Sequence, residues 1–245
     1  MIRLEVCVDS AEGVDAAVEG GADRLELCAA LGVGGLTPSP GLMAYAAAKP
    51  IPTVAMIRSR PGDFVMSEQD LAIALGDISA AQTAGLAGVV IGANQPDGTL
   101  NKAALAAMVS AANGMEVVLH RSIDLTPDIG AAAEVIAELG IVRVLTSGGE
   151  RRAIDGCKRI QQLIEVAAGR FTVMPGSGLT PENIGTLIEN LEVSDVHSSC
   201  SARRETRETI SAFGFADQSE AFTDRRRVAE MKTALYRWDS SQKSS

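Results

Sequence analysis

The feature of this sequence that most restricts its fold is a regular alternation of short apolar runs with longer stretches of helical period. Each short run ends in polar or glycine residues, as strands commonly do. Between Cys7 and His197 the runs recur about every 27 residues, the length of one strand–helix unit. Eight runs are present: Leu4–Val8, Arg24–Leu27, Thr53–Ile57, Gly88–Ile91, Glu116–Leu119, Val142–Leu145, Phe171–Met174 and Ser194–Val196.

Eight strand–helix units in 245 residues predict an α/β fold, a (β/α)8 TIM barrel that forms a single domain over residues 1–245. A doubly wound open sheet would need fewer strands or a second domain, and no Pro/Ser-rich linker precedes residue 198. Capping residues mark helix starts at Ser39-Pro40, Ser67 and Thr180-Pro181. The polar residues 198–223 predict a long irregular loop after strand eight. Asp224–Trp238 predicts the last helix, followed by a frayed tail over 239–245.

Charge and composition exclude several classes of partner. The chain has 31 acidic and 22 basic residues, and only 3% of its residues are aromatic, which argues against nucleic acid binding. No run approaches the roughly 20 apolar residues that span a bilayer, and the first residues lack the pattern of a signal peptide. We therefore expect no membrane partner and a cytoplasmic protein, in which four cysteines without CxxC spacing are free thiols.

In such a barrel the functional face lies at the carboxyl ends of the strands. Polar residues gather at these positions: Glu5, Cys7, Arg24, Glu26, Cys28, Arg58, His120, Arg121 and His197. The two histidines are the only ones in the chain, and imidazole serves as acid, base or metal ligand near neutral pH. The alternative is that each histidine is buried and holds a loop.

Four arginines, Arg24, Arg58, Arg60 and Arg121, fall on this face of an acidic protein and favour a small anionic ligand, a carboxylate or a phosphate. Alternatively, Arg24 and Arg58 pair with Glu5 and Glu26 inside the barrel. The turns Thr146–Gly149, which contains Ser147, and Gly176–Gly178 offer backbone N–H groups suited to phosphate.

Closure of the barrel would bring strands eight, one and two together, and with them His197, Cys7 and Cys28. Two thiolates and an imidazole suit Cu(I), a Cys7–His197 pair could activate a nucleophilic thiolate, and buried packing of the cysteines is the third reading. No lysine falls at a strand end, which disfavours a Schiff-base aldolase, and two histidines disfavour a multi-histidine zinc site.

Several segments together resemble one known family. They are Leu4–Cys7, Gly21–Cys28, Gly34–Ser39, Met56–Arg58 with Gly62–Phe64, His120-Arg121, Leu145–Gly149 and Val196–Ser199, and they are similar to the CutC copper-homeostasis proteins. The resemblance implies a cytoplasmic barrel, a homodimer, and Cu(I) binding by Cys7 and Cys28. It also implies a shared set at the barrel mouth: Glu5, Arg24, Glu26, Arg58, His120, Arg121, Asp124 and His197.

Two functions remain open on this sequence. The first, by resemblance, is a Cu(I)-binding protein of copper homeostasis that uses Cys7 and Cys28, with His197 as a further candidate. The second is an enzyme acting by acid/base chemistry on a small carboxylated or phosphorylated metabolite. In that enzyme Arg24 and Arg58 would hold the anion, Glu26 and His120 would exchange protons with His197 close by, and Gly176–Gly178 would hold a phosphate.

Overall fold

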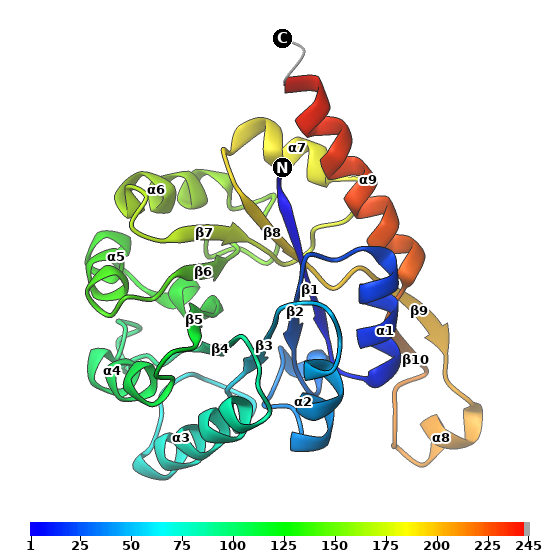
Figure 1. Cartoon of the computed structure of the whole chain (residues 1–245), viewed down its shortest axis with the longest axis horizontal. Coiled ribbons are helices and arrows are strands. Elements are labelled where there is room, and N and C mark those ends of the chain that lie inside the picture. The colour runs from blue at the N-terminus through cyan, green and yellow to red at the C-terminus, as the bar shows by residue number, and fades with distance from the viewer. Residues whose placement is uncertain (243–245) are drawn as a thin grey trace.

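The computed structural model describes residues 1–242 and shows eight parallel strands in a ring, surrounded by helices (Figure 1). The barrel strands are β1 (Arg3–Val8), β2 (Arg24–Leu27), β3 (Thr53–Met56), β4 (Gly88–Ile91), β5 (Glu116–Leu119), β6 (Arg143–Thr146), β7 (Thr172–Pro175) and β8 (Asp195–Ser198). The outer helices are α1 (Ala11–Gly20), α2 (Pro40–Ala47), α3 (Glu68–Thr83), α4 (Lys102–Ala111), α5 (Ile129–Glu138), α6 (Cys157–Ala167), α7 (Ile184–Asn190) and α9 (Arg225–Gln242). Two short 3-10 helices, η1 (Leu31–Val33) and η2 (Arg121–Leu125), follow β2 and β5.

The predicted barrel is confirmed, and each predicted apolar run contains or overlaps one barrel strand. The strands are hydrogen-bonded in the order β7-β6-β5-β4-β3-β2-β1-β8. β7 and β8 complete the ring side by side, but within residues 1–242 no backbone ladder joins them. The barrel is therefore nearly closed, with a seam between its seventh and eighth strands.

The core has two parts because alternate strand residues point to opposite faces. Outward-facing residues such as Leu4, Val6 and Leu25 pack against the helices. The interior is apolar on the side of β2 to β5, where it contains Cys28, Val54, Met56, Val90 and Val118. On the side of β1, β2, β6 and β8 it is ionic, with Glu5, Arg24, Arg143 and Asp195 all buried. The polar strand residues seen in the sequence thus fill the barrel interior and its mouth.

Two of the three helix starts predicted from capping residues are confirmed. The side chain of Ser39 caps α2, with Pro40 as its first residue, and Ser67 forms a capping box with Asp70 at α3. The stripe Val228, Met231 and Leu235 of α9 is buried, as predicted. The seventh helix begins at Ile184, three residues after Pro181, because a turn that includes a bond from Thr180 N–H to the Asn183 side chain precedes it. In the described part of the chain no helix is long and apolar enough to cross a membrane.

The segment after β8 differs from the expected irregular loop over 198–223. Strands β9 (Ser201–Glu205) and β10 (Ser219–Thr223) form an antiparallel hairpin that carries the short helix α8 (Glu208–Ala212) and projects from the ring (Figure 1). The expected frayed tail over 239–245 also differs, because α9 continues to Gln242; residues 243–245 lie outside the described residues.

Candidate functional site at the barrel mouth

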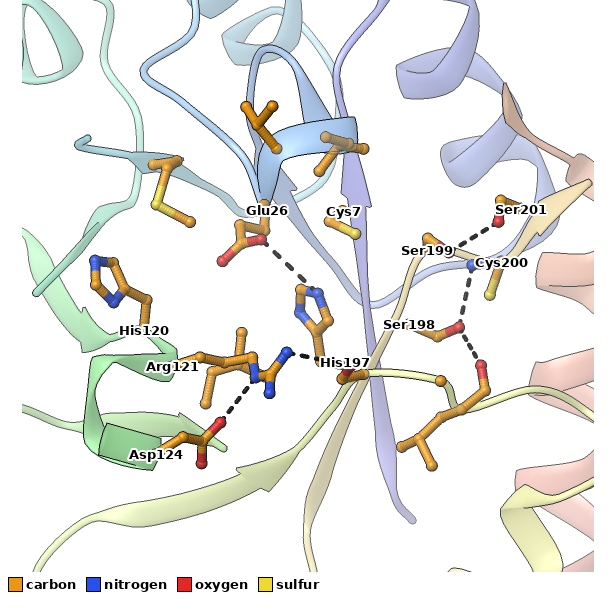
Figure 2. A pocket seen from close by; sticks show the side chains of 18 of the residues that line it. Cys7, Glu26, His120, Arg121, Asp124, His197, Ser198, Ser199, Cys200 and Ser201 are labelled. Atoms are coloured by element: carbon orange, nitrogen blue, oxygen red, sulfur yellow. Dashed lines mark hydrogen bonds and ion pairs between the residues drawn. The ribbon is translucent and has the colours of Figure 1, made fainter. Parts of the chain in front are cut away.

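Most of the polar residues predicted at the strand ends line one cavity of about 610 Å³ at the barrel mouth (Figure 2). Eight of the residues proposed from the sequence line it: Cys7, Glu26, Arg58, His120, Arg121, Asp124, Gly178 and His197. The other five lie outside its lining: Glu5, Arg24, Cys28, Ser147 and Gly176. Residues as distant in sequence as Cys7 and His197 therefore line the same cavity. The five predicted residues outside the lining do not.

Strand register determines which of these side chains are neighbours. Glu5 on β1 lies opposite Arg24 on β2 and opposite His197 on β8. Two residues further along β1, Cys7 lies opposite Glu26 on β2. Because residues at the same register and parity point to the same face, this pairing places the thiol, the carboxylate and the imidazole together.

Glu5 and His197 are joined by a buried hydrogen bond of 2.9 Å between Oε1 and Nδ1. The other oxygen of Glu5 accepts a bond of 2.5 Å from Nε of Arg24. Burial raises the pKa of Glu5, but the hydrogen bonds and charges of His197 and Arg24 outweigh it and lower that pKa to about 2. An ionised carboxylate only accepts hydrogen bonds, so Nδ1 of His197 carries the proton in this pair.

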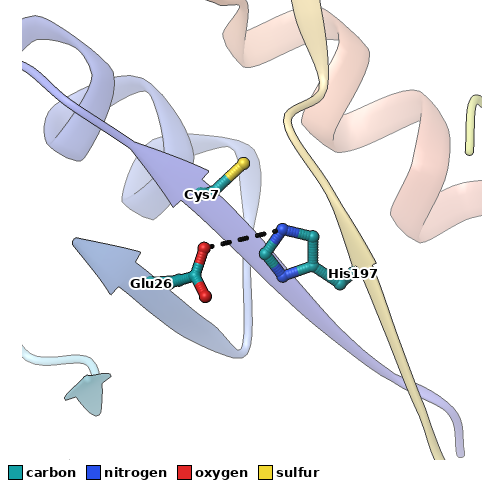
Figure 3. A group of neighbouring side chains, drawn as sticks. All are labelled: Cys7, Glu26 and His197. Atoms are coloured by element: carbon teal, nitrogen blue, oxygen red, sulfur yellow. Dashed lines mark ion pairs between the residues drawn. The ribbon is translucent and has the colours of Figure 1, made fainter. Parts of the chain in front are cut away.

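The opposite edge of the His197 ring faces Glu26 and Cys7 (Figure 3). Nε2 of His197 lies 3.8 Å from Oε2 of Glu26, and ligand atoms of all three residues lie within 4.8 Å of one another. Burial lowers the pKa of His197, but the neighbouring Cys7, Glu26 and Glu5 more than offset this and raise it well above its ordinary value. These neighbours therefore favour the protonated form of His197.

Glu26 offers only one of its two oxygens to its surroundings. Its Oε2 faces the Sγ of Cys28 at 3.6 Å and His197, whereas its buried Oε1 has no partner among the described side chains. Burial raises the pKa of Glu26, against the opposing charge of His197. A carboxyl group with a raised pKa and one free oxygen in a cavity is suited to exchange protons with a bound molecule.

Arg24, expected to hold an anion, is instead committed to the chain's own carboxylates. Besides Glu5 it binds Oδ1 of Asp195 at 3.0 Å, and Arg143 lies 3.6 Å from the same oxygen. The pairing of Arg24 with Glu5 is the alternative considered from the sequence. Desolvation lowers the pKa of Arg24, but these carboxylates raise it overall, so its charge is neutralised beneath the cavity.

In the described chain Arg58 does not form the ion pair with a carboxylate that was the alternative considered from the sequence. Its terminal nitrogens donate to the backbone oxygens of Val33, Gly35 and Gly62 at 2.8 to 3.1 Å, and its guanidinium lies 5.2 Å from the centre of the Phe64 ring. Its buried Nε lacks a partner, and in the described chain no carboxylate forms an ion pair with it. Arg58 thus brings an uncompensated positive charge to the cavity and ties together the loops after β2 and β3.

His120 is buried at the end of β5 and caps η2, since its Nδ1 accepts a bond of 3.1 Å from the backbone N–H of Ser122. Burial and the charge of Arg58 lower its pKa to about 3, so it is neutral at physiological pH. Its Nε2 has no partner within the described structure. The predicted exchange of protons by His120 does not fit a ring with this pKa, but donation of a hydrogen bond does.

The turn Thr146–Gly149 does cradle an anion, as its composition predicts, but that anion is Asp124. The Asp124 carboxylate accepts bonds from Thr146 Oγ1 at 2.6 Å and from the backbone N–H groups of Ser147 and Gly149 at 3.1 Å. Arg121 binds the same carboxylate at 2.8 Å and also reaches the Ser147 hydroxyl at 2.6 Å. The chain's own carboxylate therefore occupies the predicted phosphate nest.

The second turn, Gly176–Gly178, supports the site through its lack of side chains. A Cβ on Gly176 would lie 2.5 Å from Leu145 Cδ1 and 2.9 Å from the Cβ of His197, so glycine lets His197 pack closely. Gly178 lines the cavity with a φ of +69°. Of the two, only Gly178 stays in position to meet a ligand.

Two cysteines differ in position from what the sequence indicates. Cys28 is fully buried outside the cavity lining, and its pKa is raised well above the usual value by burial and by Glu26. Cys200, which is not among the candidate residues named from the sequence, lines the cavity together with Arg227 and Phe64. Burial raises the pKa of Cys200 to about 11, and Figure 2 shows it apart from Cys7. Of these additional lining residues, only Phe64 had a signal in the sequence, through the resemblance of the Gly62–Phe64 segment.

Comparison with known proteins agrees with this architecture. The solved structure named as a copper homeostasis protein, CutC, from Streptococcus agalactiae superimposes with a TM-score of 0.78 at 29% identity and covers 81% of this chain and 99% of that chain. Phosphoribosyl anthranilate isomerase from Thermotoga maritima matches with a TM-score of 0.57 at 15% identity, which shows only that the barrel fold is shared.

Sequence comparison is more specific. The family protein CutC of Rhizobium meliloti (strain 1021) is 48% identical over 235 residues, 96% of each chain, and that of Caulobacter vibrioides is 44% identical over 237 residues. The model of the CutC family matches residues 2–202, which include every barrel strand. This chain therefore belongs to the CutC family.

Proposed function

We propose that this protein is an enzyme that binds a small anionic metabolite at the barrel mouth and transfers protons on it, with Glu26 as the general acid/base. One observation carries the proposal. Three buried polar atoms without a partner among the described residues belong to side chains of this single cavity: Glu26 Oε1, Arg58 Nε and His120 Nε2. Leaving such an atom unpaired costs about 1–3 kcal/mol, so a ligand that pairs with them gains this free energy on binding.

The charges around the cavity favour an anionic ligand. Arg24 is neutralised by Glu5 and Asp195, and Arg121 by Asp124, whereas Arg58 has no carboxylate partner in the described chain. A carboxylate or phosphate near Arg58 would supply the missing charge. Of the two arginines expected to hold the anion, Arg24 and Arg58, only Arg58 therefore remains for this role.

A screen of small carboxylates and phosphates tests this function. We expect at least one compound to raise the Tm of the wild-type protein, and Glu26→Gln to bind it but fail to turn it over. Glu116→Gln is the matched control, because Glu116 lies on β5 but outside the cavity. A broad panel in which no carboxylate or phosphate binds would refute the proposal.

Copper binding is the second candidate, and a separate observation favours it. A relative is named for copper homeostasis, and here Cys7, Glu26 and His197 present ligand atoms within 4.8 Å of one another. Thiolate and imidazole suit Cu(I), so Cys7 and His197 fit such an ion. Cys28 fits poorly, because its buried thiol donates to Glu26 and its pKa is raised well above the usual value.

Anaerobic competition for Cu(I) distinguishes these ligands. If the barrel mouth binds copper, Cys7→Ser weakens the affinity at least about tenfold, whereas Cys28→Ser leaves it close to wild type. Equal affinities for the wild type and for the double variant Cys7→Ser, Cys28→Ser would remove the copper function.

We also propose that the protein acts in the cytoplasm, since its four cysteines are free thiols, as expected in a reducing compartment. A homodimer remains a prediction, which light scattering of the purified protein tests.

A further inference from the structure

The imidazole of His120 is held in one orientation on three sides. Its Nδ1 accepts the backbone N–H of Ser122 at 3.1 Å. Gly92 lies directly against the ring, because a Cβ at that position would be 2.0 Å from Cε1. The Phe64 ring covers it with a distance of 4.7 Å between ring centres. The ring therefore cannot turn to exchange its two nitrogens without breaking these contacts.

This orientation also determines which nitrogen carries the proton. A nitrogen that accepts a hydrogen bond has no proton, so the neutral ring carries its single proton on Nε2. The ring is neutral because burial and Arg58 keep its pKa at about 3. His120, which lines the cavity, thus carries a fixed, uncharged and buried N–H donor, and no residue in the described part of the chain accepts from it.

A buried uncharged donor of this kind selects its partner. It rejects a ligand atom that is itself a donor, because two N–H or O–H groups would then face each other. It pairs well with a carbonyl oxygen and better still when that oxygen gains negative charge during a reaction, as in oxyanion holes. The anionic group of a ligand is better matched to Arg58, which carries a full positive charge.

Glu26 faces the same space as His120 (Figure 2). Its Oε2 is occupied by Cys28 and His197, so Oε1 is the oxygen available to a ligand. Removal of a proton from the carbon beside a carbonyl requires two groups: a donor that polarises the carbonyl and a base that takes the proton. Here Nε2–H of His120 would be the donor, and Oε1 of Glu26 would be the base.

We propose that the substrate is a small enolisable aldehyde or ketone bearing a phosphate or carboxylate, whose carbonyl oxygen accepts a hydrogen bond from Nε2 of His120. This inference rests on the function proposed above and names its substrate class. In the reaction, Oε1 of Glu26 takes the proton from the neighbouring carbon. The C–H electron pair forms the C=C bond, the carbonyl π pair moves to oxygen, and the resulting enolate keeps its bond to His120. Return of the proton from Glu26 regenerates the ketone or aldehyde, so no oxidant or other reactant is consumed.

Exchange of carbon-bound hydrogen in D₂O, followed by proton NMR, tests the inference with dihydroxyacetone phosphate and pyruvate as probes. We expect the wild-type protein to exchange the hydrogen next to the carbonyl of at least one probe, and Glu26→Gln to abolish this exchange. His120→Asn retains a side-chain oxygen that can cap η2, but its shorter side chain leaves no N–H group at the position of Nε2, and it should lower the rate about 100-fold. His120→Gln extends an amide N–H toward the cavity and should recover part of the rate.

Two further results separate this inference from the proposed function. Glycerol 3-phosphate and lactate carry the same anionic groups without the carbonyl; if they bind as well as the probes and neither probe exchanges, the anion-binding enzyme stands and the carbonyl substrate is refuted. Nitrogen chemical shifts of His120 at neutral pH give an independent readout. They should show a neutral ring protonated at Nε2, and a ring protonated at Nδ1 would overturn the inference.

Discussion

Glu5 and His197 join the first and last strands of the barrel through a buried hydrogen bond of 2.9 Å. Because Arg24 holds Glu5 as a carboxylate, the bond orients His197 with Nδ1–H toward Glu5 and Nε2 toward Glu26 and Cys7. The same pair therefore closes one side of the ring and sets the protonation of the site.

Removing the charge of Glu5 should be costly. Glu5→Gln leaves Arg24 and His197 buried with less negative charge around them, and we expect the free energy of unfolding to fall by about 3 kcal/mol. Urea denaturation at neutral pH measures this loss. Glu116→Gln removes a half-exposed partner of Arg143 and should cost less than about 1 kcal/mol; similar losses for both variants would contradict the prediction.

His120 should make the protein less stable in mild acid. Its pKa falls from 6.5 to about 3 on folding, so between these values the unfolded chain binds more protons and stability decreases as the pH decreases. We expect a loss of about 1.5 kcal/mol from pH 6.5 to about pH 5, which His120→Asn removes. His197, whose pKa is raised, contributes stability that is fully present below pH 6.5 and is lost only at higher pH. Glu5, whose pKa is lowered, contributes stability that is lost only as the pH falls from 4.5 to about 2. An unchanged slope in His120→Asn would show that other groups cause it.

Gly92 should tolerate no side chain. The methyl group of Gly92→Ala would overlap the His120 ring, and we expect a loss of stability of about 2 kcal/mol together with loss of ligand binding. Gly76→Ala is the matched control: Gly76 lies on the exposed face of α3 with open space around it, and alanine there should stabilise the protein by about 0.5–1 kcal/mol. Thermal unfolding of both variants decides, and a Gly92→Ala protein as stable as the wild type would contradict the close approach of the His120 ring to Gly92.

Asp124 should behave as a built-in anion. Asp124→Ala empties the turn Thr146–Gly149 and leaves Arg121 without its carboxylate partner, which should cost about 2 kcal/mol. Added phosphate should then raise the Tm of this variant more than that of the wild type, compared with chloride at equal ionic strength. Equal responses to phosphate would mean that the turn does not bind anions by itself.

The sequence was sufficient for the barrel and for the identity of most residues at its mouth. Its strand signals are strong because each barrel strand is buried on both faces, and helix starts such as Ser39 and Ser67 are encoded by their own side chains. The strand-end residues named from the sequence also include Glu5, Cys7 and Glu26, which the register of β1 and β2 brings together.

Pairing between elements was less predictable, since it depends on register. The register between β1 and β2 places Cys7 opposite Glu26, whereas Cys28 lies beyond Glu26 in the buried interior. A shift of this register by one residue would change these neighbours. Similarly, composition shows that the turn Thr146–Gly149 can bind an anion, but only the tertiary structure brings Asp124 to it. The hairpin of β9 and β10 escaped prediction because its strands are mostly exposed and carry no apolar alternation.

The seam between β7 and β8 divides the site into two mechanical parts. Glu26 and His120 lie on or just after strands that a continuous hydrogen-bonded ladder connects from β2 to β5, whereas His197 lies on β8, which within residues 1–242 has a backbone ladder only to β1 and meets β7 through packing. Small outward shifts of β8 would therefore change the surroundings of the His197 ring without changing the distance between the Glu26 carboxylate and the His120 ring. Substitutions near β8 can therefore change the environment of His197 while Glu26 and His120 keep their relative positions.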